Sequence, residues 1–212
     1  MNYLTSIPRK AIQHAHLGGH AWTYPKCLPP RWTEAEYKAP DDLQTVVALK
    51  HNYQKHWKEG FRLFQDLQTA LPEFTFSYGD HHSAGHLDDF TAIRGAAFLA
   101  SIRAPFLDPA DYACIKAMYS GRLIIGSRQS WGGCPQLQDV LLTCDGAVLY
   151  DTPGPQWPKT AFYRGAEEVI TQVANDPDEW HARSMALREA TKQLIDPEAH
   201  KDSTIRWLED LR

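Results

Sequence analysis

The stretch DPADYACIKAMYSGRLIIGS, residues 108–127, indicates the fold class, because it contains the pattern of one helix, one turn and one strand. Asp108 and Pro109 are the residue types of an N-cap and a first helical position, which predicts that a helix begins here. Gly121 is the residue type that ends a helix. Leu123–Gly126 is a short apolar run, as expected for a strand buried on both faces of a parallel sheet.

The same alternation of short apolar runs and amphipathic stretches extends in both directions from this unit, and it predicts an α/β domain with a Rossmann-like parallel sheet flanked by helices. The predicted strands are Thr45–Leu49, Phe74–Tyr78, Ala97–Ile102, Leu123–Gly126 and Ala147–Tyr150. The predicted helices are His56–Ala70, Leu87–Arg94, Pro109–Tyr119 and two or three helices over residues 160–212, the longest from Pro177 to about Leu194. This domain covers residues 44–212.

Residues 1–43 differ from the rest, because five prolines interrupt any helical period there. We expect an irregular, partly extended N-terminal arm with at most one short helix. Its apolar side chains need burial that an irregular segment does not supply alone. The arm is therefore expected to pack against another chain or across the cleft of its own domain.

The composition is that of an ordinary globular protein, with 43% hydrophobic residues, 23% charged residues and a net charge of −4. This charge argues against a generally basic nucleic-acid-binding protein. The four cysteines form no CxxC motif, which indicates free thiols in a reducing compartment. The sequence has no apolar run of membrane-spanning length and no secretory apolar segment at its start, so we expect a cytoplasmic protein.

Cations cluster directly after the first predicted strand. Lys50, His51, Lys55 and Lys58 lie between that strand and the start of its helix, where backbone N–H groups already favour an anion. A diphosphate is the ligand that this loop suggests. The alternative is a solvated basic turn.

Two further loops follow predicted strands. The first contains Asp108 and leads into the helix that carries Lys116. The second contains Ser130, Gly132 and Gly133, and its adjacent glycines allow backbone amides to approach a ligand closely. Because open α/β sheets bind ligands at the carboxyl ends of their strands, these loops and the lysine loop are the candidate binding site.

Four segments together resemble the C-terminal, nucleotide-sugar-binding domain of GT-B glycosyltransferases, especially the group of glycogen and sucrose synthases. These are HWKEGFRLFQDL at 56–67, DPADYACIKAMYSGRLIIGS at 108–127, GGCPQLQDVLLTCDGAVLYD at 132–151 and GAEEVITQVANDPDEWHARSMALREATKQ at 165–193. The resemblance covers roughly 150 residues in the family's order and implies half of a GT-B fold. It also implies transfer of a glycosyl group from a nucleotide-diphosphate sugar, without a metal or other cofactor.

The resemblance assigns roles to single residues. Asp108 would orient the donor sugar, and the lysines of the first loop would neutralise the diphosphate. The family has a ribose-contacting glutamate where this chain has Lys116, and another glutamate where it has Gln136. A lysine does not accept hydrogen bonds from ribose hydroxyls, so the donor is unusual or activity is reduced. Two alternatives follow: a non-catalytic nucleotide-binding module, or the donor-binding subunit of a split enzyme.

The family's other Rossmann-like domain, which binds the acceptor, does not fit into 43 residues. A homodimer or a partner subunit would complete the cleft. His16 and His20 of the arm are candidates for the general base, because the pKa of histidine suits that role. The histidine spacing in the arm matches no standard zinc pattern. The sequence leaves the acceptor open among a saccharide, a lipid, a small molecule and a modified nucleic-acid base.

Overall fold

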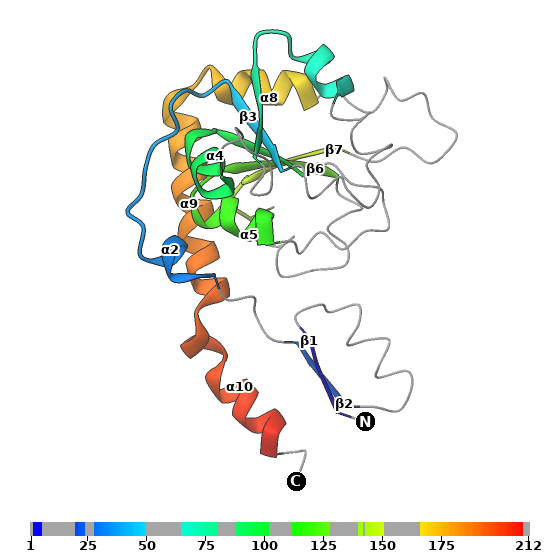
Figure 1. Ribbon diagram of the computed structural model, residues 1–212, viewed down its shortest axis with the longest axis vertical. Coiled ribbons are helices and arrows are strands. Elements are labelled where there is room, and N and C mark those ends of the chain that lie inside the picture. Colours follow the sequence, from blue (N-terminus) through cyan, green and yellow to red (C-terminus); the bar gives the residue numbers. More distant parts are fainter. Residues whose placement is uncertain are drawn as a thin grey trace, which may run out of the picture.

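The computed structural model describes residues 2–5, 20–23, 28–49, 65–79, 88–101, 112–127, 140–141, 143–150 and 166–209. Its centre is a five-stranded parallel sheet with helices packed around it (Figure 1). The strands are β3 (Thr45–Leu49), β4 (Thr75–Gly79), β5 (Phe98–Ser101), β6 (Leu123–Ser127) and β7 (Ala147–Tyr150). The sequence prediction of a parallel α/β sheet is therefore confirmed.

The strand order is β4-β3-β5-β6-β7, and every neighbouring pair is parallel. Val46 of β3 pairs with Phe76 of β4 on one side and with Phe98 of β5 on the other. A strand in this central position is covered on both faces, and Val46, Val47 and Ala48 are fully buried. This burial explains why β3 is a continuous apolar run without polar alternation.

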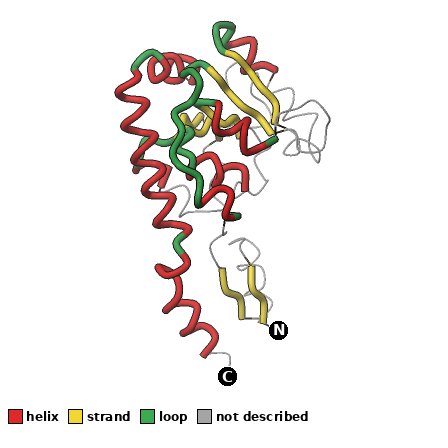
Figure 2. The backbone as a smooth tube through the Cα atoms, turned by 60° about the vertical axis from the view of Figure 1, so that its left-hand side comes forward, coloured by secondary structure: helices red, strands yellow, loops and turns green. Residues whose placement is uncertain are grey.

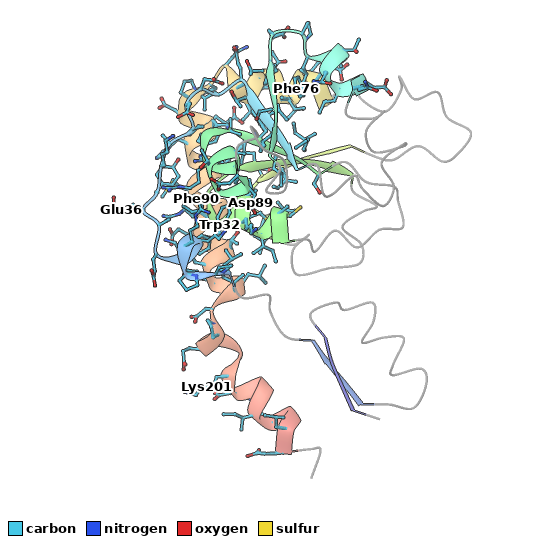
Figure 3. All side chains as sticks on the ribbon, in the orientation of Figure 1. Trp32, Glu36, Phe76, Asp89, Phe90 and Lys201 are labelled. Atoms are coloured by element: carbon cyan, nitrogen blue, oxygen red, sulfur yellow. The ribbon has the colours of Figure 1, made fainter. Side chains whose placement is uncertain are left out.

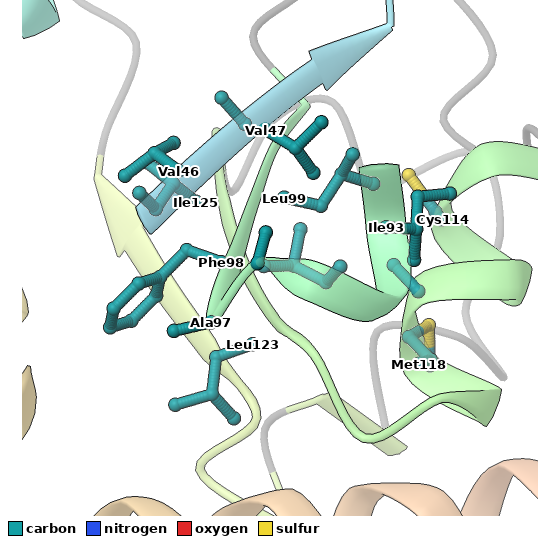
Figure 4. Close-up of a cluster of buried hydrophobic side chains, with 14 of the residues drawn as sticks. Val46, Val47, Ile93, Ala97, Phe98, Leu99, Cys114, Met118, Leu123 and Ile125 are labelled. Carbon is teal, nitrogen blue, oxygen red and sulfur yellow. The ribbon is translucent and has the colours of Figure 1, made fainter. Parts of the chain in front are cut away.

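Two helices, α4 (Asp89–Gly95) and α5 (Tyr112–Tyr119), pack beside the central strands. Figure 4 shows Ile93 of α4 and Met118 of α5 in one cluster with Leu99 of β5. All three side chains are fully buried. Residues 65–70 are helical, as the predicted helix His56–Ala70 requires, and Leu67 is fully buried.

Three helices follow the last strand: α8 (Ala166–Ala174), α9 (Pro177–Ile195) and α10 (Pro197–Glu209). Helix α9 begins at Pro177, as predicted, and the carboxylate of Asp176 caps this start by accepting a hydrogen bond from the Glu179 backbone N–H at 3.0 Å. Helix α9 runs along the sheet, and α10 continues away from it (Figures 1 and 2). No helix in the described ranges is long and apolar enough to cross a membrane.

The N-terminal arm is less irregular than the sequence indicated. It contains the expected short helix, α2 (Pro30–Thr33), but also two strands, β1 (Asn2–Thr5) and β2 (His20–Thr23). These strands pair in parallel in a small sheet of their own. The prediction of an irregular arm was wrong at this point, because NYLT and HAWT mix polar with apolar residues and so contain no apolar run.

The last part of the arm packs against its own domain. Leu28 and Trp32 belong to the hydrophobic core, with 8% and 4% of their surfaces exposed. Residues 34–41, here called the strap, then lead from α2 toward β3 without forming a helix or a strand. The side chain of Arg94 donates to the backbone carbonyl of Glu36 at 2.5 Å, and the backbone N–H of Asp41 donates to the Gly95 carbonyl at 3.0 Å.

A buried arginine fastens the middle of the strap. Arg122 directly precedes β6 and is 0% exposed. Its guanidinium donates to the carbonyls of Ile93 at 3.2 Å, Arg94 at 2.8 Å and Lys38 of the strap. Burial lowers the pKa of Arg122 to about 10, a value that leaves the guanidinium charged at neutral pH. No carboxylate pairs with it among the described residues, so the charge is held by carbonyl dipoles.

Gly121 ends α5 as the sequence predicted. Its φ is +73°, in the left-handed region that favours glycine. The Gly121 N–H donates to the Met118 carbonyl at 2.9 Å and the Arg122 N–H to the Ala117 carbonyl at 2.8 Å, the two bonds of a Schellman motif. A Cβ at this position would lie 2.6 Å from the Ser184 Oγ of α9. Both the backbone conformation and the packing therefore require glycine.

We expect Gly121→Ala to lower the free energy of unfolding by about 2 kcal/mol or more, because a left-handed alanine is strained and its methyl group displaces Ser184. Urea denaturation measures the change. Ser120→Ala at the preceding position is the control and should stay within about 0.5 kcal/mol of wild type. Equal stabilities of the two variants would contradict the assigned helix end.

We expect Arg122→Lys to cost about 2–3 kcal/mol, because one ammonium does not reach three carbonyls, and buried acceptors are left without donors. Arg206→Lys on the exposed side of α10 is the matched control and should change stability by less than about 0.5 kcal/mol. Chemical unfolding at pH 7 measures both. A loss no larger than that of the control would show that the strap does not depend on the guanidinium.

Candidate functional site

The strand order identifies one edge of the sheet as the candidate ligand site. The chain runs from β3 to the edge strand β4, returns to β5 on the other side of β3, and then continues to β6 and β7. The direction of winding therefore changes between β3 and β5. In open parallel sheets, the crevice at such a switch point, at the carboxyl ends of the strands, is the usual ligand site.

The three loops that the sequence analysis selected all begin at this edge. They follow Leu49 at the end of β3, Ser101 at the end of β5 and Ser127 at the end of β6. Since β3, β5 and β6 are neighbours in the sheet, the loops start from adjacent positions. The two strands at the switch point itself precede the lysine loop and the loop with Asp108.

Most of the candidate residues themselves lie outside the described ranges. These are His16 of the arm and Lys50, His51, Lys55, Lys58, Asp108, Ser130, Gly132, Gly133 and Gln136 of the loops. The backbone of His20 is described, and it begins β2 of the small N-terminal sheet. The topology thus supports a shared location for the loops, and the individual contacts stay predictions.

Lys116 is the one donor-site candidate with a described side chain. It lies one turn inside α5, and its Nζ forms an ion pair with Asp89 Oδ2, at the start of α4. Both side chains are 17% exposed. The same ammonium group lies 5.2 Å from the centre of the Trp32 ring. Lys116 therefore has two partners within the protein: a carboxylate and an aromatic face.

The sequence does not identify Asp89 or Trp32 as partners of Lys116. The three residues come from α4, α2 and α5, and only the fold brings them together. Asp and Lys separated by 27 positions carry no periodic signal in the sequence. The apolar character of Trp32 and its position in a proline-rich segment indicated packing but not the surface against which it packs.

The start of α4 is well fixed. The carboxylate of Asp88 accepts hydrogen bonds from the Phe90 N–H at 3.0 Å and the Thr91 N–H at 3.2 Å, and Arg31 of α2 lies 3.0 Å from it. Burial alone raises the pKa of Asp88, but the hydrogen bonds from Thr91 and Phe90 and the charge of Arg31 outweigh it and lower the pKa below its usual value. Asp88 is therefore an ionised helix cap.

The end of β5 is fixed to α5 by two small side chains. Cys114 is fully buried, and its Sγ donates to the Ser101 Oγ at 3.2 Å. Ser101 is the last residue of β5 and is 3% exposed. The loop that contains Asp108 connects β5 to α5. The contact between Ser101 and Cys114 therefore holds the two ends of this connection together.

A groove of about 540 Å³ lies elsewhere, at the junction of α9 and α10, with Leu28, Ile195 and Pro197 in its lining. It contains none of the candidate donor residues. Within the described ranges, no three side chains of the metal-binding types gather at one point.

Comparison with known proteins identifies the fold. No protein-family model matches the sequence, and no curated protein matches it significantly. The sucrose-phosphate synthase of Thermosynechococcus elongatus is similar in structure over 99% of this chain and 58% of its own, with a TM-score of 0.63 and 13% identity. The glycotransferase of kitacinnamycin (96% and 54% of the chains, TM-score 0.49, 15% identity) and the calicheamicin glycosyltransferase (97% and 52%, TM-score 0.45, 14% identity) are more distant.

The chain thus spans a little over half the length of the sucrose-phosphate synthase that it resembles. At 13% identity the likeness concerns the fold, and it agrees with the resemblance expected from the four sequence segments. By its fold, the chain is a GT-B glycosyltransferase-like domain.

Proposed function

We propose that this protein binds a nucleotide-diphosphate sugar and takes part in transferring the glycosyl group to an acceptor. The observation that carries the proposal is the strand order, which starts the lysine loop and the Asp108 loop from adjacent strands at the switch point. The structural likeness to a sucrose-phosphate synthase supports the same reading.

In the proposed reaction, the bond between the anomeric carbon and the diphosphate oxygen breaks, and the acceptor oxygen forms a bond to that carbon. Lys50, Lys55 and Lys58, with His51, stabilise the charge that develops on the departing diphosphate. Asp108 orients the donor sugar. Ser130, Gln136 and the amides near Gly132 and Gly133 hold sugar or phosphate oxygens.

The acceptor's proton needs a base, and His16 or His20 takes this role in the proposal. Both belong to the N-terminal segment rather than to the parallel sheet. In this proposal a second domain binds the acceptor, because this chain spans only 58% of the similar synthase. A second copy or a partner subunit would supply it.

A second candidate function is nucleotide binding without transfer. It is favoured by Lys116, because this lysine stands at the position where the GT-B resemblance has a carboxylate for the ribose. The Lys116 ammonium group is paired with Asp89. The two functions differ in one measurable product: a transferase releases free nucleoside diphosphate when donor and acceptor are present, and a binding module does not.

The lysine loop provides the test of the donor site. We expect Lys58→Ala to weaken binding of a nucleoside diphosphate by about ten- to a hundredfold, because a charge-assisted hydrogen bond contributes about 1.5–3 kcal/mol. The melting temperature of the unliganded protein should stay nearly constant. Calorimetry with UDP, ADP and GDP and their nucleosides, on wild type and on Lys50→Ala, Lys55→Ala and Lys58→Ala, measures the effect.

Lys201→Ala on α10 is the matched control, since Lys201 pairs only with its helix neighbour Glu198 among the described residues. It should bind every nucleotide as wild type does. If no diphosphate binds better than its nucleoside, or if all three loop variants equal wild type, the proposed donor site is wrong.

A further inference from the structure

Three structural elements meet at Lys116. Asp89 is the first residue of α4, Lys116 lies one turn inside α5, and Trp32 belongs to α2 of the N-terminal arm. Figure 3 shows Trp32, Asp89 and Phe90 close together on one side of the domain. The Trp32 ring packs edge-on against Phe90 at 4.9 Å, and Trp32 is 4% exposed.

The ion pair between Lys116 and Asp89 is shielded from solvent, so its loss is expected to affect stability. Lys116 and Asp89 are each 17% exposed, in contrast to the surface pair Lys192–Glu189 of α9, where the exposed fractions are 36% and 55%. Removing one member of a shielded pair leaves the other charge without compensation. The Lys116 ammonium is therefore held in place by Asp89 and by the Trp32 face.

Neighbouring contacts tie α2 to the same two helices. Arg31 pairs with Asp88 at 3.0 Å and lies over the Phe90 ring at 4.2 Å. The Tyr119 hydroxyl of α5 donates to the Thr33 carbonyl at 3.2 Å. The short helix of the arm thus bridges α4 and α5 directly.

We propose that Trp32, Asp89 and Lys116 form a latch by which the N-terminal arm holds the start of α4 against the second half of α5, and that Lys116 serves nucleotide binding as a positioning residue rather than as a donor contact. The second half of this statement rests on the proposed function. Helices that connect parallel strands run opposite to them, so the starts of α4 and α5 face the carboxyl edge of the sheet. The latch therefore sets the spacing of two helices at the candidate site.

The latch and a direct donor contact predict opposite effects for one substitution. If Lys116 bound a donor phosphate itself, Asp89→Asn would remove a competing negative charge and leave or increase diphosphate affinity. If Lys116 acts through Asp89, the same change loosens the helices and weakens binding. Lys116→Met would weaken binding in both cases, so Asp89→Asn is the decisive variant.

The experiment measures binding of UDP, ADP and GDP by calorimetry for wild type, Lys116→Met, Asp89→Asn and the double variant. Each single change is expected to weaken binding about tenfold, and the double variant is expected to bind no more weakly than either single one, because both remove the same interaction. Lys192→Met and Glu189→Gln remove the exposed pair of α9 as matched controls and should leave affinity unchanged.

Hydrogen exchange of the α4 and α5 amides, without ligand, provides an independent readout of the latch. Exchange should accelerate about tenfold in Lys116→Met and Asp89→Asn and not in the controls. Unchanged exchange overturns the latch. Faster exchange with undiminished affinity in Asp89→Asn, or additive losses in the double variant, overturns the positioning role.

The two proposals fail in different ways. If wild type binds none of the diphosphates, the proposed function fails and the positioning role fails with it, while the exchange rates still decide whether the latch holds the two helices. If wild type binds a diphosphate and both single variants bind it as tightly as wild type does, the proposed function stands and the positioning role is wrong.

Discussion

The bonds from Arg122 to three backbone carbonyls are the interaction on which the placement of the N-terminal segment depends. Two of the carbonyls belong to the end of α4 and one to Lys38 of the strap. The guanidinium thus joins a helix of the domain to a segment that has no regular structure of its own. A charge buried without an ion-pair partner is costly, and the three hydrogen bonds to carbonyls offset part of this cost.

Aromatic side chains extend this anchoring along the strap. Tyr37 faces Arg122 at 5.9 Å and Arg188 of α9 at 5.4 Å, and its hydroxyl lies 3.4 Å from the Ser184 Oγ. The same Ser184 hydroxyl donates to the Gly121 carbonyl at 2.6 Å. The helix end at Gly121, the strap and α9 therefore share one set of contacts at the amino edge of the sheet, opposite the candidate site.

The sequence predicted the parallel sheet well, because β3 and β7 are short apolar runs with clear ends and Gly121 is a helix stop of unambiguous chemistry. It did not predict β1 (NYLT) and β2 (HAWT), because their mixed polar and apolar residues form no apolar run. It left open whether the arm packs against another chain or across the cleft of its own domain, and Trp32 of the arm lies in the core of its own domain. Contacts of this kind depend on tertiary structure and leave no local pattern.

The candidate site, like the fold, could be predicted from the sequence only in part. Strand ends and their order follow from local sequence and from winding rules, so the loops after β3, β5 and β6 could be selected before the fold was known. The partner of Lys116 could not, because Asp89 lies 27 residues earlier on a different helix. The resemblance marked position 116 as unusual for the family, and the fold supplies the reason why a lysine is accommodated there.

The way the strap is fastened has a consequence for synthesis on the ribosome. Its contacts are far apart along the chain: 84 residues separate Lys38 from Arg122, and 147 separate Tyr37 from Ser184. Closing such large loops before the intervening strands have formed is entropically unfavourable. The strap leaves the exit tunnel before these partners do, and it is therefore among the last parts of the domain to reach its final position, after α9 has emerged. Until then, Trp32 and its neighbours are exposed on the nascent chain and available to the chaperones that bind apolar segments.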